Sequence, residues 1–332
     1  MHILKGYTKQ EISWMMYDWA NSAHSVIIVT LLPIFFDTVA GYTADSVSSM
    51  STWGYATSIA MLIVALAAPF LGVFGDIRGM RKKLFSFFML LGVAACAGMA
   101  FTPGMDFTSG PVAAGKVATL ILVLYIVSVI GFDASAIYYD AFLTDVTTEN
   151  RMDKVSTMGY GLGYIGGSTI PLLIFLIMNL VGVPMLTCLA FVFGLTAVWW
   201  LAFSLPLLKN CEQTSGKPYE KGDVARSIKG VGTTIKEIIA NKPMLIYILS
   251  YFFYIDGVHT VISMATTYGT NLGLDSTGMM LALLLVQILG LPFCLLYMKL
   301  AEKFGARTMV GVGICVYMFI CVFAFFMNSL WQ

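Results

Sequence analysis

The sequence predicts an all-α polytopic membrane protein, because of its composition, its long apolar runs and the placement of its basic residues. Of the 332 residues, 58% are hydrophobic and 11% are charged, whereas a soluble domain is about 45–50% apolar and about 25% charged. A bilayer core of ~30 Å is crossed by about 20 apolar residues in a helix. The apolar runs are continuous, which favours helices over a β-barrel, whose strands alternate with a period of two.

About nine runs have the length of a membrane span, and all nine are predicted to be helices. They are, in order, 14–39, 52–74, 84–102, 117–140, 157–179, 184–208, 243–269, 276–298 and 308–328.

The basic residues predict which face of the membrane each link occupies. All but Lys116 of the 19 lysines and arginines lie in the N-terminal lead or in the links after the second, fourth, sixth and eighth runs. Loops rich in lysine and arginine stay in the cytoplasm. The pattern therefore predicts a cytoplasmic N-terminus, and an odd number of spans then places the C-terminus outside.

The same segmentation predicts three parts. Residues 1–208 are expected to form a six-helix N-terminal half, 209–242 a cytoplasmic linker, and 243–332 an incomplete C-terminal half of about three helices. The first part of the linker, Lys209 to Asp223, is expected to be flexible.

The second part of the linker, Ala225–Ile239, has the pattern of an amphipathic helix. Such a helix can lie on the inner membrane surface, and a solvated linker helix fits the pattern equally well. The apolar positions are Ile228, Val231, Ile235 and Ile238, beside Arg226, Lys229 and Lys236.

A polar motif in the first predicted helix is echoed in the seventh. When His24 is aligned with His259, Asn21 falls on Asp256 and Ser25 on Thr260. Two of the three histidines of the chain therefore occupy matching places in two spans. This internal repeat predicts two related halves that meet around these polar patches.

A second repeat lies in the links after the second and the eighth helix. The expected gating residues there are Asp76, Gly79 and Arg81 in the first link and Glu302, Gly305 and Arg307 in the second. The glycine permits a tight turn. The carboxylate can pair with the basic residue or with a neighbouring helix end, which would latch the inner face in one state.

Polar and ionisable side chains inside the spans are candidates for substrate binding or proton coupling. Each ionised group costs ~2.5–3.5 kcal/mol at the bilayer centre on insertion scales, so such residues are functional candidates by default. A structural hydrogen bond between helices is the alternative, and for the two histidines an interior side chain bonded to a neighbour is the plainer interpretation. The candidates are Asp18, Asn21, His24, Asp133, Asp256 and His259.

Two further patterns concern packing and solvation. Gly159, Gly163 and Gly167 recur at intervals of four in the fifth predicted helix, a spacing that allows a second helix to approach closely. The link after the fourth helix is charged, and its residues, Asp145 and Arg151 among them, are expected to be mostly solvated.

The loop from Gly72 to Lys82 resembles the signature cytoplasmic loop of the major facilitator superfamily. The motifs Tyr17–Ala23, Tyr139–Leu143 and Gly163–Gly167 are similar to those of the branch that includes the autophagy-related vacuolar amino-acid effluxers and many bacterial proteins of unassigned substrate. The chain departs from that branch at His24, at His259 and at Asp140. Members of the superfamily usually have twelve helices, so this sequence is either a piece of a longer chain or has a degenerate second half.

The resemblance implies a major-facilitator-like fold and secondary active transport of a small solute by alternating access. It also implies amino-acid-like cargo, with export and proton coupling as further expectations, and a multi-pass protein of the bacterial cytoplasmic (inner) membrane. The expected partners are a small-molecule substrate, protons and the lipid bilayer, without nucleic acid. The alternative is a non-transporting membrane receptor or assembly partner that acts through the linker.

Enzymatic activity, cofactors and metals are not expected. The sequence has no GxxxxGK[ST] loop and no HExxH motif, the patterns that bind nucleotide phosphates and catalytic zinc. Its six cysteines form no CxxC pair, so they are interpreted as small apolar side chains.

Overall fold

The computed structural model describes residues 4–43, 48–216, 218 and 223–329, and within these ranges the chain is helical, with turns and no β-strand. Nine helical stretches of the described chain are long and apolar enough to cross a membrane, so the prediction of an all-α polytopic protein with about nine spans is confirmed. The chain divides into two compact units, Met1–Val224 and Ala225–Gln332. Each unit is described by itself.

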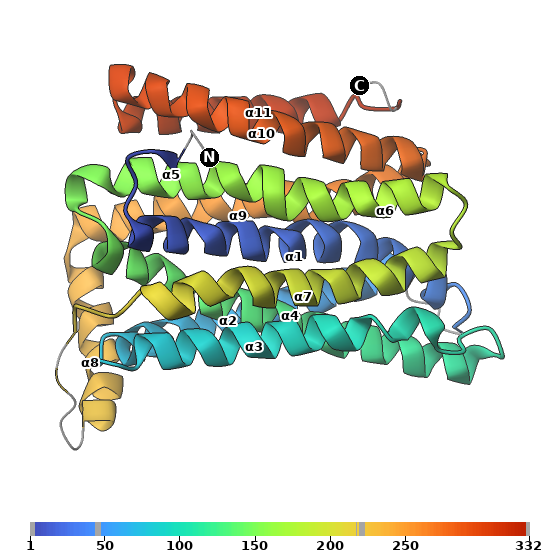
Figure 1. Cartoon of the computed structure of the whole chain (residues 1–332), viewed down its shortest axis with the longest axis horizontal. Coiled ribbons are helices and arrows are strands. Elements are labelled where there is room, and N and C mark those ends of the chain that lie inside the picture. The colour runs from blue at the N-terminus through green and yellow to red at the C-terminus, as the bar shows by residue number, and fades with distance from the viewer. Residues whose placement is uncertain (1–3, 44–47, 217, 219–222, 330–332) are drawn as a thin grey trace. The chain divides into compact units, whose positions relative to one another are not determined.

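The first unit is a bundle of long helices that run side by side (Figure 1). In it α1 is the most enclosed helix and contacts α4, α5 and α7. The helices are α1 (Lys9–Ala40), α2 (Ser49–Gly75), α3 (Arg81–Met99), α4 (Pro111–Val146), α5 (Met152–Gly163), α6 (Ile170–Leu180) and α7 (Met185–Asn210), with short 3-10 turns at Thr102–Gly104 and Glu149–Arg151 and a π-helical segment at Tyr164–Thr169.

Several helices extend beyond the apolar runs that predicted them. Helix α1 begins at Lys9 because Thr8 and Glu11 form a capping box: the Thr8 hydroxyl accepts from the Glu11 N–H at 3.1 Å, and the Glu11 carboxylate accepts from the Thr8 N–H at 2.7 Å. Such a cap satisfies orphan backbone donors outside the hydrocarbon. Hydropathy alone cannot detect this extension, since the added residues Lys9–Ser13 are polar apart from Ile12.

The fifth predicted helix is confirmed as a close packing partner, and its partner is α1. A Cβ atom at Gly159 would lie 2.6 Å from Asp18 Oδ2, and one at Gly163 would lie 3.1 Å from the Asp18 carbonyl oxygen. At Gly166 and Gly167 an added Cβ would overlap Trp19. Glycine at these four positions lets α5 and the π-helical segment lie directly against α1.

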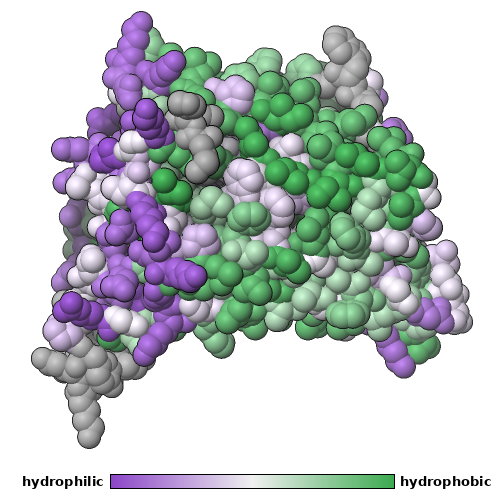
Figure 2. Space-filling view, in the orientation of Figure 1, coloured by the Kyte–Doolittle hydropathy of each residue, from purple (hydrophilic) through white to green (hydrophobic). Residues whose placement is uncertain are grey.

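The surface of the bundle is mostly hydrophobic along the helices, and hydrophilic residues gather at the end where α1 and α3 begin and α7 ends (Figure 2). This end carries Lys9, Arg81, Arg151 and Lys209 and is called the basic end below. A hydrophobic middle flanked by polar ends is the arrangement that a bilayer requires of a spanning bundle.

The second unit comprises α8 (Asp223–Ala240), α9 (Lys242–Asn271), α10 (Ser276–Phe304) and α11 (Ala306–Ala324). Helix α8 runs across the direction of α9 (Figure 1). The predicted linker helix is therefore present, while the side chains of Arg226, Ile228 and Lys229 lie outside the described part of the chain. Its place on a membrane surface stays a prediction.

Candidate functional site

The polar face of α1 points into the first unit rather than onto its surface. His24 is 2% exposed, its Nε2 lies 3.2 Å from Ser128 Oγ, and its ring stacks on Phe132 at 4.7 Å between centroids. Its Nδ1 atom has no hydrogen-bond partner among the described residues. The contacts are those of an interior histidine that joins α1 to α4.

Aromatic side chains with hydrogen bonds line α1 on the N-terminal side of this histidine. The Tyr17 hydroxyl lies 2.8 Å from Ser135 Oγ and accepts from Trp200 Nε1 at 3.3 Å. Trp14 stacks on Tyr139 at 4.3 Å and donates its Nε1–H to the Tyr139 carbonyl oxygen at 2.9 Å. These contacts hold α1 against α4 and α7, because the side chains of Tyr17 and Trp14 each combine a ring contact with a hydrogen bond.

Asp18 and Asp133, both inside spans of the first unit, make no ion pair within the described chain. Asp18 is partly exposed and faces α5 at Gly159. Asp133 on α4 is also partly exposed and directly follows Phe132, the residue that stacks on His24. Asn21 is buried on α1. The structure thus places Asp18, Asn21 and His24 along one helix, with Asp133 on its neighbour α4.

The matching candidates of the second unit lie on α9. The side chains of Asp256 and His259 are both exposed. The substrate and proton-coupling roles of the six candidates stay predictions.

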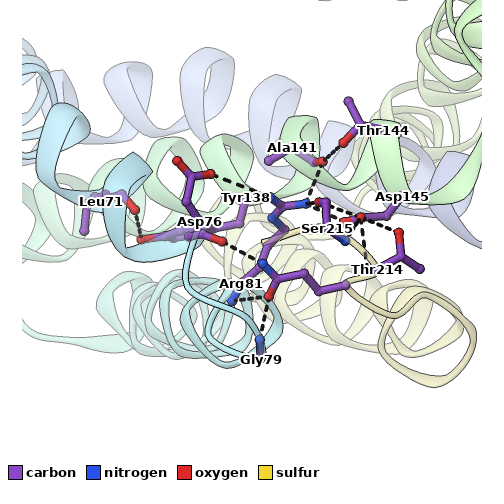
Figure 3. A network of polar contacts seen from close by, with 12 residues as sticks. Leu71, Asp76, Gly79, Arg81, Tyr138, Ala141, Thr144, Asp145, Thr214 and Ser215 are labelled. Carbon is purple, nitrogen blue, oxygen red and sulfur yellow. Dashed lines mark hydrogen bonds and ion pairs between the residues drawn. The ribbon is translucent and has the colours of Figure 1, made fainter. Parts of the chain in front are cut away.

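At the basic end, Arg81 lies at the centre of a network of polar contacts (Figure 3). Its guanidinium forms an ion pair with Asp145 at the end of α4 and donates to the Ala141 carbonyl oxygen at 3.0 Å. The side chains of Arg81 and Asp145 are 5% and 0% exposed. Asp76, by contrast, is 3.8 Å from Arg81 and its side chain is 76% exposed, so Asp145 is the principal partner of the arginine.

The turn glycines behave as their motif predicted. Gly79 has φ = +82° between α2 and α3, and Gly305 has φ = +84° between α10 and α11, a conformation that residues with a Cβ rarely adopt. In the second loop Glu302 and Arg307 are exposed, and among the described residues neither forms an ion pair. The two loops share a backbone turn and differ in how tightly they are held.

Two expectations for the basic end are wrong. Asp145 was expected in a solvated link but is buried with Arg81, because α4 runs six residues beyond the apolar run that predicted it. The segment Cys211–Gly216, called the strap, was expected to be flexible but binds the network: Thr214 and Ser215 donate to Asp145, and Gln213 bonds the α2–α3 turn. No sequence signal beyond a short polar run with glycine marks these residues.

A second ion pair fastens the start of α1. Arg151 Nε donates to Glu11 Oε1 at 2.9 Å and its Nη2 donates to Glu11 Oε2 at 2.9 Å. The Thr147 hydroxyl donates to the same carboxylate at 2.7 Å, and Glu11 is 1% exposed. The Glu11 carboxylate thus joins α1 to the end of α4 and to the link that precedes α5. Arg151, too, is tied into the structure rather than simply solvated.

No group of three or more potential metal ligands lies close together in the described chain. The network at the basic end consists of ion pairs and hydrogen bonds that join the ends of helices. Its role as a latch that holds one arrangement of the helices stays a prediction.

Comparisons with known proteins agree with this fold. The model of the family described as "Vacuole effluxer Atg22 like" matches residues 42–149 and 144–331. The uncharacterized MFS-type transporter YxiO of Bacillus subtilis (strain 168) is 40% identical over 335 residues, which cover 98% of this chain and 76% of YxiO. Autophagy-related protein 22-1 of Penicillium rubens is 24% identical over 177 residues, which cover 50% of this chain and 30% of that protein.

Among solved structures, the xylose transporter XylE of E. coli, in a partially occluded inward open conformation, matches with a TM-score of 0.54 at 13% identity. The match covers 90% of this chain and 73% of XylE. A D-xylose-proton symporter matches with a TM-score of 0.52 at 14% identity over 89% of this chain and 69% of that one. At these identities the likeness concerns the fold alone. With the family match and YxiO, it follows that the chain belongs to the Atg22-like family of the major facilitator superfamily, a family of multi-pass membrane transporters rather than enzymes.

Proposed function

We propose that the chain is a secondary active transporter that moves a small solute by alternating access. In this proposal the candidate substrate contacts are Asp18 and Asn21 in the first unit, and Asp256 and His259 in the second. Asp133 or Asp256 carries the coupled proton.

The observation that carries the proposal is the presence of carboxyl groups without an ion-pair partner inside helices that span the membrane. Asp18 and Asp133 form no ion pair among the described residues of the first unit, and Asp256 forms none on α9. Each such group costs ~2.5–3.5 kcal/mol at the bilayer centre when ionised. A receptor or scaffold does not need ionisable groups inside the membrane, so this energetic penalty would be unexplained. A coupled transporter needs such groups, because they gain and lose a proton during the transport cycle.

The buried contacts of His24 favour the carboxyl groups over the histidine as proton carriers. His24 is enclosed by Phe132, Trp200 and Ser128, so a proton on its ring would require a charge in an aromatic core. We therefore assign His24 to the positioning of α1.

Amino-acid-like cargo and export are the finer parts of the proposal. Export is supported by the description of the family as vacuole effluxer-like. Amino-acid-like cargo is supported by the resemblance of the motifs Tyr17–Ala23, Tyr139–Leu143 and Gly163–Gly167 to those of the vacuolar amino-acid effluxers. The basic end is proposed to face the cytoplasm of a bacterial cell, supported by the bias of lysine and arginine to that end.

The test is proton-driven transport of labelled amino acids in proteoliposomes under an imposed pH gradient. Asp256→Asn and Asp133→Asn are compared with Asp106→Asn as the matched control, because Asp106 is an exposed loop residue outside the spans. We expect at least one of the two span variants to lose pH-driven transport while it keeps the elution profile of the folded protein, and Asp106→Asn to keep both.

Unchanged transport in both span variants would refute proton coupling through these carboxyl groups. If no amino acid moves while another class of small solute does, the cargo assignment is wrong and the transport mechanism stands.

A further inference from the structure

The strap supplies the cap that the turn between α2 and α3 lacks. Helix ends leave backbone groups without intrahelical partners, and Met80, at the start of α3, makes no side-chain capping bond. Gln213 Oε1 accepts from the N–H groups of Gly79 at 2.8 Å and Arg81 at 3.3 Å, and its Nε2 donates to the Gly75 carbonyl oxygen at 2.9 Å. One amide side chain therefore bonds the end of α2 and the start of α3 together.

The next two residues of the strap enclose the ion pair. Asp145 Oδ1 accepts four hydrogen bonds, from the N–H and hydroxyl groups of Thr214 at 3.1 and 2.8 Å and from those of Ser215 at 2.9 and 2.8 Å. Oδ2 accepts from Arg81, whose guanidinium also donates to Ser215 Oγ at 3.2 Å. The strap and the arginine thus share one carboxylate, and together they leave its side chain with no exposed surface.

Both ends of the strap are held in place by close contacts with the first unit. Gly216 has φ = +123°, and a Cβ there would lie 2.7 Å from the Asp76 carbonyl oxygen. At the other end Cys211 is buried, and its carbonyl oxygen accepts from Lys82 Nζ at 3.1 Å. The strap is the stretch of the linker that directly follows α7, so a displacement of the rest of the linker would be transmitted to this turn through it.

We infer that Gln213 is a positioning residue of the gate at the basic end, and that the strap ties the state of the linker to the Arg81–Asp145 latch. With the strap attached, Gln213 holds the α2–α3 turn and Arg81 is held on Asp145. With the strap released, the turn loses its cap and the carboxylate loses four donors, so the latch weakens. This inference rests on the two-unit transport mechanism proposed above and adds Gln213, Thr214 and Ser215 to the residues that control it.

The first test uses Cys211 as the reporter of strap release, in a protein whose other five cysteines are replaced. Cys211 has no exposed surface, so a maleimide reaches it when the strap opens. Gln213→Ala removes three hydrogen bonds and should raise the labelling rate at least about tenfold. Glu212→Ala is the matched control, because Glu212 is the exposed neighbour, and it should leave the rate unchanged. Thr214→Val with Ser215→Ala tests the other half of the strap if Gln213→Ala does not fold.

The second test separates a gating role from a merely structural one. Spin labels at Lys83 in the first turn of α3 and at Glu302 near the end of α10, both exposed and beside the repeated loops, report the distance between those two helix ends in lipid nanodiscs. We expect Gln213→Ala to change the populations of the distance distribution, and Glu212→Ala to leave them as in the unaltered protein.

Faster labelling of Cys211 together with a shifted distribution supports the inference. An unchanged labelling rate overturns it, because the strap then does not depend on Gln213. Faster labelling with an unchanged distribution also overturns it, because the strap is then only a clamp within the first unit. Failure of the proposed transport mechanism would appear instead in the protein with an intact strap, as a single distance that pH does not alter and no transport.

Discussion

Replacing Gly131 by alanine should force α3 and α4 apart at a point where their backbones touch. A Cβ at Gly131 would lie 2.5 Å from the Gly92 nitrogen, 2.7 Å from its Cα and 2.8 Å from the Phe88 carbonyl oxygen. The shortest of these is about 0.9 Å inside ordinary van der Waals contact. All three atoms belong to the backbone, so no side-chain rotation can relieve the overlap.

Two opposing effects, overpacking and helix propensity, set the expected change in the free energy of unfolding. Overpacking of this kind costs about 1–3 kcal/mol, and a rigid backbone contact belongs at the upper end of that range. Alanine returns up to about 1 kcal/mol through its higher helix propensity. The net loss should be about 2 kcal/mol, which corresponds to a fall in Tm of about 4–8 °C for a unit of this size.

Gly115→Ala provides the matched control on the same helix. A Cβ at Gly115 meets no atom of the described chain within 4 Å, so the substitution should be neutral or slightly stabilising. Thermal unfolding of the purified protein in one detergent, followed by intrinsic fluorescence, compares the two variants. If both variants melt at the same temperature, the contact between α3 and α4 at Gly131 is not formed as described, and the reasoning fails.

Three further predictions concern other parts of the chain. Burial raises the pKa of the Cys211 thiol to about 12, and the thiolate is the form that reacts with maleimide. Maleimide should therefore label this thiol slowly in the folded protein at every pH from about 7 to 9, and rapidly after denaturation. Mass spectrometry of the labelled protein would measure both rates. Glu11→Gln leaves Arg151 with a neutral partner and should lower Tm, with a loss of about 1–3 kcal/mol in the free energy of unfolding. Arg151→Gln should lower the free energy of unfolding by a similar amount. Additive losses in the double variant would argue against coupling between the two residues. A nitroxide at Ile235 on α8 should be more accessible to oxygen than to a water-soluble nickel complex in nanodiscs, with the reverse at Glu237, if this helix lies on the membrane; equal accessibility at both sites would favour a solvated helix.

The sequence by itself determined the fold class, the number of spans in the described chain and the glycine turns of the two repeated loops. Length and hydropathy suffice for the spans, because a bilayer forces each crossing segment to be an apolar helix with all its backbone bonds satisfied internally. The conformation of Gly79 and Gly305 could be predicted because a tight turn needs a residue without a Cβ. Close packing at Gly159, Gly163 and Gly167 was readable from their spacing for the same reason.

Only the tertiary structure decided the partners of the polar groups. Arg81 has Asp76 nearby in sequence, yet its buried partner is Asp145, which is 64 residues away in sequence. Gln213 caps a turn that precedes it by more than 130 residues. Residue type predicts that a buried charge or a helix end needs a partner, but any suitable group in the chain can supply one. Which group does so depends on how the helices pack, and the sequence pattern of one helix carries no record of that choice.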